Sequence, residues 1–175
     1  MPQDAELVAG MIRGEPGAFA DLYQRYRARL HQYALSLIRS RMEAEDVVHD
    51  VFIGLARQAG GGRMPRELSA YLYVSVRNRC LDLLRRKPER SLEDADLDLA
   101  VAPPGDEERI GLRQVLNRAL RALPPEQAEV VVLRTWHDLE FAAIAALQGT
   151  SVNTALSRYQ YGLEKLRKEL GVHAR

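Results

Sequence analysis

Apolar residues recur along this chain at intervals of three and four, the spacing that gives a helix one apolar face, and no segment alternates as a strand does. In the first half, this spacing predicts helices at about 4–13, 17–40, 43–58 and 68–87. In the second half, it predicts helices near 108–122, 125–136, 139–147 and 151–170. We therefore expect an all-α fold.

The segment 89–109 interrupts the helical pattern with Pro103, Pro104, Gly105 and a dense run of acidic residues. This composition is typical of an interdomain linker, although a short helix inside it is compatible with the sequence. We expect two small helical domains, residues 1–88 and 110–175, joined by an acidic flexible linker over 89–109.

Composition places the chain among cytoplasmic globular proteins. Its 175 residues are 46% hydrophobic and 28% charged, and no apolar run approaches the roughly 20 residues of a membrane span. The first residues lack the basic start and long apolar core of a secretion signal. Cys80 is the only cysteine, which excludes an internal disulfide and a CxxC metal site.

The net charge of +1 conceals an uneven distribution along the chain. Residues 1–88 hold 14 basic and 10 acidic residues, residues 89–109 hold 2 and 8, and residues 110–175 hold 9 and 6, giving net charges of +4, −6 and +3. Neither basic block is strong enough to hold DNA tightly alone, because phosphate neutralisation supplies most non-specific affinity. A DNA-binding function would therefore depend on a partner that holds the DNA.

Residues 139–168 predict a helix-turn-helix, because Gly149 ends one apolar run and Ser151 can cap the longer helix that follows. One arc of that second helix is apolar: Val152, Ala155, Tyr159, Gly162, Leu163, Leu166 and Leu170. The other arc offers groups suited to base edges and phosphates: Asn153, Thr154, Ser157, Arg158 and Tyr161. The alternative is an ordinary amphipathic helix that ends a bundle.

Two helices of the first domain carry further candidate surfaces. The 68–87 helix places polar and aromatic groups opposite its apolar face: Tyr71, Asn78, Arg79, Arg85 and Arg86. They suit stacking on bases and pairing with phosphates, or else form a solvated charged face. The 43–58 helix carries Glu45, Asp46, His49, Asp50 and Phe52. These favour a protein-binding face, unless the acids are simply solvated and the apolar residues are core.

The chain resembles the extracytoplasmic-function (ECF) sigma factors of bacterial RNA polymerase. FADLYQRYRARLHQYAL, EAEDVVHDVFIGLAR and SAYLYVSVRNRCLDLLRR are similar to sigma domain 2. LPPEQAEVVVLRTWHDLEFAAIA and SVNTALSRYQYGLEKLR are similar to sigma domain 4, and no domain 3 fits between them. The resemblance implies a transcription initiation factor of a stress or envelope-type response, which binds core RNA polymerase and promoter DNA and is sometimes held by an anti-sigma factor.

The resemblance also implies a role for each candidate surface. The residues Glu45 to Phe52 would dock on the clamp helices of the polymerase, and Tyr71, Asn78, Arg79, Arg85 and Arg86 would read and open the −10 element. The loop 59–67 would form the pocket for a flipped base, and Asn153, Thr154, Ser157, Arg158 and Tyr161 would read the −35 element. Two positions depart from the family pattern, since Ala143 replaces a frequent glutamate and Leu156 a frequent lysine.

No enzyme motif appears in the sequence. The four histidines are scattered without metal-binding spacing, so we expect no catalytic residue, metal, cofactor or small-molecule substrate. Two alternatives remain: a dimeric repressor or activator that binds a palindrome without polymerase, and a polymerase-binding anti-activator that never reads DNA. The acidic linker either mimics nucleic acid, threading toward the RNA exit path or shielding the basic domains, or is a solubilising spacer.

Overall fold

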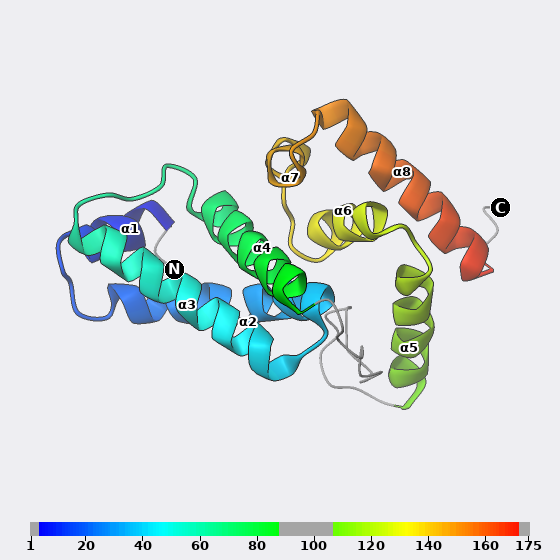
Figure 1. The fold of residues 1–175 in the computed structure, drawn as a ribbon, viewed down its shortest axis with the longest axis horizontal. Helices are drawn as coiled ribbons and strands as arrows, with labels where there is room; N and C mark the ends of the chain where they lie inside the picture. Colours follow the sequence, from blue (N-terminus) through cyan, green and yellow to red (C-terminus); the bar gives the residue numbers. More distant parts are fainter. Residues whose placement is uncertain (1–3, 88–106, 172–175) are drawn as a thin grey trace. The chain divides into compact units, whose positions relative to one another are not determined.

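The computed structural model describes residues 4–87 and 107–171, with the side chains of 107–110, 112 and 113 excepted. The chain divides into two compact units, Met1–Glu93 and Asp94–Arg175 (Figure 1). All regular structure in the described ranges is α-helical. The expected acidic linker lies almost wholly outside these ranges, so both of its proposed roles stay predictions.

The first unit is built around α2, which packs against α1, α3 and α4. Its helices are α1 (Asp4–Ile12), α2 (Ala18–Ile38), α3 (Arg41–Gly60) and α4 (Leu68–Arg86). Its core includes fully buried residues from three helices: Leu22, Leu30, Tyr33, Phe52, Leu55, Leu72, Tyr73 and Val76. Cys80 joins this core, and its burial raises the pKa of the thiol to about 12.

Polar contacts at the helix ends fix the boundaries of this unit. The hydroxyl of Ser40 accepts a hydrogen bond from the Glu43 amide at 3.4 Å, so α3 begins at Arg41, two residues earlier than expected. Such a cap satisfies one of the unpaired amides of the first turn. At the start of α1, Asp4 accepts hydrogen bonds from two residues of α2: from Arg25, at 2.6 Å, and from the Tyr26 hydroxyl.

The second unit is organised around its last helix, α8, which packs against each of the other three. Its helices are α5 (Glu107–Arg121), α6 (Pro125–Thr135), α7 (Phe141–Gln148) and α8 (Val152–Glu169). An edge-to-face pair of Phe141 and Tyr159, with ring centroids 5.4 Å apart, joins α7 to α8. Gly162 lets α8 approach α6 closely, because a Cβ there would lie 2.8 Å from Cγ2 of Val131.

The helical pattern is confirmed with small shifts at the helix ends, and the packing arcs are confirmed in large part. In α3, the apolar residues that form one face of the helix are all buried: Val47, Val48, Val51, Phe52 and Leu55. Val152 is different: we expect it to pack, but 48% of its surface is exposed, so that assignment is wrong. The buried line of α8 begins only at Ala155. None of the helices in the described ranges combines the length and apolarity that a membrane crossing requires.

Candidate nucleic-acid and protein interfaces

The start of α8 is shaped by two local signals. Gly149 ends α7 with φ at 64°, a left-handed conformation that glycine adopts without strain. The Ser151 hydroxyl then accepts a hydrogen bond from the Thr154 amide at 3.1 Å. Together they turn the chain and leave Asn153, Thr154 and Ser157 exposed on the first turns of α8. In a helix-turn-helix, this N-terminal part of the second helix is the part that can enter a DNA groove.

Arg158 is held in place by a chain of hydrogen bonds that the sequence does not reveal. Its Nη1 donates to Oε1 of Gln148 at 2.8 Å. Nε2 of Gln148 donates in turn to Oε2 of the buried Glu129 at 2.7 Å, and to the Glu126 carbonyl at 3.1 Å. Gln148 thus ties α8 to α6, and it limits the directions in which the guanidinium can point.

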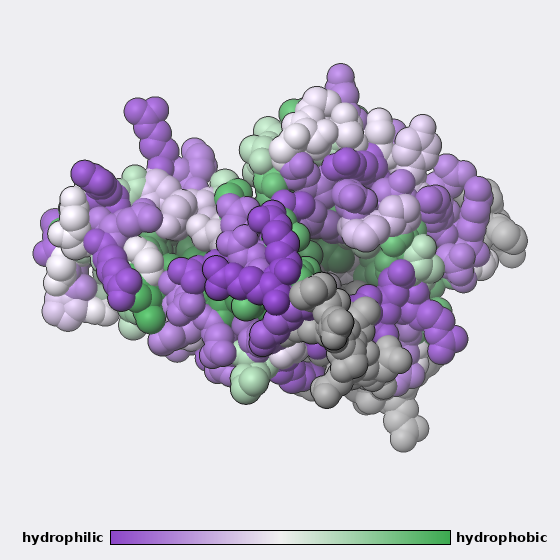
Figure 2. All heavy atoms as spheres, viewed as in Figure 1, coloured by the Kyte–Doolittle hydropathy of each residue, from purple (hydrophilic) through white to green (hydrophobic). Residues whose placement is uncertain are grey.

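The candidate −10 residues of α4 fall into two groups. Asn78, Arg79, Arg85 and Arg86 are exposed, and Figure 2 shows hydrophilic side chains over the C-terminal part of this helix. Tyr71 is half-buried, and its hydroxyl accepts a hydrogen bond from Nε2 of Gln58 at 2.7 Å. Its ring is therefore anchored to the end of α3, beside the loop at 61–67 that turns at Gly62 with φ at 69°.

Glu45, Asp46, His49 and Asp50 of α3 are all exposed and so are available to a protein partner. Phe52 is not. It is 1% exposed and packs edge-to-face with Tyr23, with ring centroids 4.9 Å apart. The expected direct contact of Phe52 with polymerase is therefore corrected: this side chain belongs to the core that holds α3 on α2.

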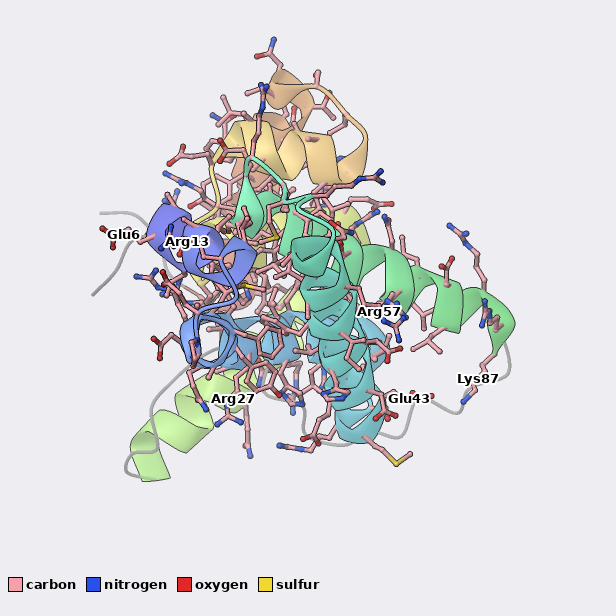
Figure 3. The ribbon with its side chains drawn as sticks, turned by 90° about the vertical axis from the view of Figure 1, so that its left-hand side faces the viewer. Glu6, Arg13, Arg27, Glu43, Arg57 and Lys87 are labelled. Carbon is pink, nitrogen blue, oxygen red and sulfur yellow. The ribbon has the colours of Figure 1, made fainter. Side chains whose placement is uncertain are left out.

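The acidic residues of α3 line two separate grooves. One, of about 540 Å³ between α2 and α3, is bordered by Glu45, His31, Met42 and Arg27, the last labelled in Figure 3. The other, of about 390 Å³ between α3 and α4, is lined on its α3 side by acidic residues that include Asp46 and Asp50, and on its α4 side mainly by basic ones. The groove between α2 and α3 thus holds one acidic residue of α3, Glu45, whereas the groove between α3 and α4 has an acidic side and a mainly basic side.

Ion pairs cross the second groove and join the two candidate surfaces. Nη1 of Arg79 lies 2.9 Å from Oδ2 of Asp50, and Nζ of Lys87 lies 3.0 Å from Oε1 of Glu43 (Figure 3 labels the second pair). Within α4, Arg85 pairs with Asp82 at 3.3 Å. The Asp50–Arg79 contact could not be predicted from the sequence, since the two residues are 29 positions apart.

The described residues gather no group of three or more histidine, cysteine or acidic side chains able to hold a metal ion. The features that stand out are an exposed polar row on α8, an arginine-rich face on α4 and an acidic face on α3. Two of these surfaces suit nucleic acid, and the third suits a protein.

Comparisons with known proteins agree with this arrangement. The model of Sigma-70 region 2 matches residues 22–89, and that of Sigma-70, region 4 matches residues 113–166. The chain is 33% identical over 172 residues to the ECF RNA polymerase sigma factor SigM of Mycobacterium tuberculosis, covering 96% of this chain and 85% of that protein. It is 32% identical over 162 residues to the RNA polymerase sigma factor CarQ of Myxococcus xanthus, covering 90% and 92%.

Solved structures show the same fold. The sigma factor RpoE from Bartonella quintana, in complex with the anti-sigma factor NepR, has a TM-score of 0.70 at 24% identity, covering 90% of this chain and 99% of that one. CnrH, in complex with the cytosolic domain of CnrY, has a TM-score of 0.70 at 25% identity, covering 98% and 99%. The chain therefore belongs to the ECF family of bacterial sigma factors, transcription initiation factors that bind core RNA polymerase and direct promoter recognition and melting.

Proposed function

We propose that this sigma factor divides its work among three surfaces. The exposed acids and His49 of α3 contact core polymerase, the arginine-rich face of α4 contacts the −10 element, and the start of α8 reads the −35 element. The observation that carries the proposal is the row of exposed polar side chains on α8, whose start is fixed by the Ser151 cap. Residues 1–88 and 110–175 are the two working domains.

The −35 reader is proposed to consist of Asn153, Thr154, Ser157, Arg158 and Tyr161. All are exposed except Arg158, which the bond to Gln148 orients. The −10 reader is proposed to consist of Tyr71, Asn78, Arg79, Arg85 and Arg86, with the loop receiving an unstacked base; this loop is 61–67, since residues 59 and 60, expected to belong to it, are the end of α3. Aromatic and guanidinium planes can stack on such a base, and unstacking it costs a few kcal/mol.

This mechanism is one of binding, and we propose no catalytic residue, cofactor or small-molecule substrate. Polymerase carries out the nucleotide chemistry, so the protein acts in the cytoplasm, where polymerase and promoters are. We further propose regulation by an anti-sigma factor in a stress or envelope-type response. The sigma factor RpoE from Bartonella quintana, which has the same fold, is solved in complex with the anti-sigma factor NepR, and that complex supports this proposal.

Replacement of Arg158 by alanine tests the −35 reader. We expect promoter-specific run-off transcription by the reconstituted holoenzyme to fall by roughly 10- to 100-fold, the loss typical of an arginine that contacts a base. Arg167→Ala is the matched control, because it removes an exposed charge from the last turn of the same helix. Asn78→Ala tests the −10 reader in the same assay.

The outcomes separate the three classes of protein considered. A dimeric repressor would bind duplex DNA tightly alone and would not co-purify with core polymerase. An anti-activator would co-purify with polymerase, but it would direct no specific transcript, with or without Arg158 and Asn78. Only a sigma factor both co-purifies and gives run-off that depends on these residues.

The Asp50–Arg79 ion pair allows a sharper assignment of roles. Both side chains are about half exposed, so the pair contributes about 1 kcal/mol or less to folding. Asp50→Asn is expected to weaken binding to core polymerase, whereas Arg79→Ala is expected to spare that binding and reduce promoter opening, read by permanganate footprinting. If Asp50→Asn leaves polymerase affinity intact and reduces opening as Arg79→Ala does, then Asp50 serves to position Arg79.

A further inference from the structure

Two apolar side chains stand exposed on the first turns of the helix proposed to read DNA. Val152 is 48% exposed and Leu156 is 38% exposed. They are four residues apart in α8 and so lie on the same side of the helix. Single exposed apolar residues are ordinary, but these two adjoin the polar row that faces away from the core.

Their position on α8 follows from the residues that the helix buries. Ala155, Gly162 and Leu166 mark the inner side, which faces the rest of the second unit. Leu156 comes three residues after Asn153, a spacing that makes the two neighbours on the helix surface. A groove that admits Asn153 therefore also receives Leu156, and Val152 lies one turn nearer the helix start.

The DNA major groove offers an apolar side chain one distinctive partner. Every A·T pair presents the 5-methyl group of thymine there, whereas the other exposed features are hydrogen-bond donors and acceptors. The hydroxyls of Ser157 and Thr154 and the amide of Asn153 can use those polar edges. Val152 and Leu156 can gain only by covering a methyl group and removing apolar surface from water.

We propose that Val152 and Leu156 are specificity-determining residues that read thymine methyl groups in the −35 element. The inference rests on the proposed function, since it needs α8 to lie in the major groove. It also accounts for the uncharged Leu156 among polar neighbours: this position supplies discrimination between bases and no phosphate pairing.

The test replaces each thymine of the upstream promoter box, one at a time, by deoxyuridine, which lacks the methyl group and keeps the pairing edges. Promoters are first located by sequencing transcripts induced on overexpression, and binding is measured with the reconstituted holoenzyme. At one or two positions, we expect deoxyuridine to weaken binding roughly three- to fivefold, as expected for one buried methyl group. Leu156→Ala and Val152→Ala should weaken binding to thymine DNA and abolish the difference between thymine and deoxyuridine.

Two further variants sharpen this result. Val115→Ala is the matched control, because Val115 is 50% exposed on α5 of the same unit, and its loss should leave the thymine preference intact. Leu156→Lys should lose the preference while making binding more dependent on salt, since a new phosphate contact makes the slope of log K against log salt more negative by about 0.9. Both α8 side chains are exposed, so neither truncation should unfold the unit.

The proposal is overturned if deoxyuridine leaves binding unchanged at every position, or if Leu156→Ala and Val152→Ala keep the full preference for thymine over deoxyuridine. It is also overturned if Leu156→Ala weakens holoenzyme assembly and leaves the preference unchanged, which would assign the pair to a protein contact. In each case, wild-type holoenzyme still gives promoter-specific run-off. Failure of the proposed function is distinct, because wild-type holoenzyme then gives none, and the inference falls with it.

Discussion

Replacement of Phe52 by alanine is expected to destabilise the first unit by about 3–5 kcal/mol, the cost of removing a fully buried phenyl ring from a packed core. The ring is 1% exposed and packs edge-to-face against Tyr23 and Phe19. Its loss leaves a cavity between α2 and α3, so the acids of α3 lose their fixed position. Binding to core polymerase should therefore fall as well.

The single tryptophan lets this loss be assigned to one unit. Trp136, at the end of α6, reports on the second unit by fluorescence, whereas circular dichroism reports on all the helices. During urea unfolding of Phe52→Ala, the circular dichroism transition should move to lower urea and the fluorescence transition should stay. Met42→Ala is the control on α3, because Met42 is 72% exposed and its truncation should move neither. Normal stability with lost polymerase binding would make Phe52 a contact residue instead.

The second large effect is expected at Gly162, where alanine should destabilise the second unit by about 1–3 kcal/mol. The added Cβ would lie 2.8 Å from Cγ2 of Val131 and 3.4 Å from the carbonyl oxygen of Gln127. This crowding outweighs the roughly 1 kcal/mol by which alanine favours a helix over glycine. Because α8 must move away from α6, promoter-specific run-off should fall together with stability.

Gly111→Ala is the matched control for that substitution. Gly111 also lies within a helix of the second unit, but a Cβ there meets nothing within 4 Å. The variant should be unchanged or slightly more stable. The Gly162→Ala variant should shift the Trp136 fluorescence transition and spare the transition of the first unit. Equal stability of the two variants would show that α6 and α8 are not closely packed at this point.

Much of the local structure could be predicted from sequence, because helix formation depends on near neighbours. Three- and four-residue spacing located the helices, and Gly149 and Ser151 located the turn before α8 through their own backbone and capping preferences. The spacing could not tell a core from an interface, since both need an apolar side chain. Phe52 shows this limit: the same pattern suits a buried ring and a docking contact.

Contacts between helices could not be predicted from the sequence, for a different reason. The pair of Asp50 and Arg79 and the hydrogen bond from Gln148 to Glu129 join residues 29 and 19 positions apart. No local rule connects such residues. Val152 illustrates a third limit. A helical wheel gives the direction in which a side chain points, but it does not show whether another helix covers that part of α8.

The burial of Cys80 bears on what this protein can sense. Burial raises the pKa of its sulfhydryl to about 12, so the reactive anion is scarce near neutral pH. Peroxides and electrophiles react with that anion, and the protein has no second cysteine. A thiol-based oxidative signal that reaches transcription through this protein would therefore have to be detected on another molecule.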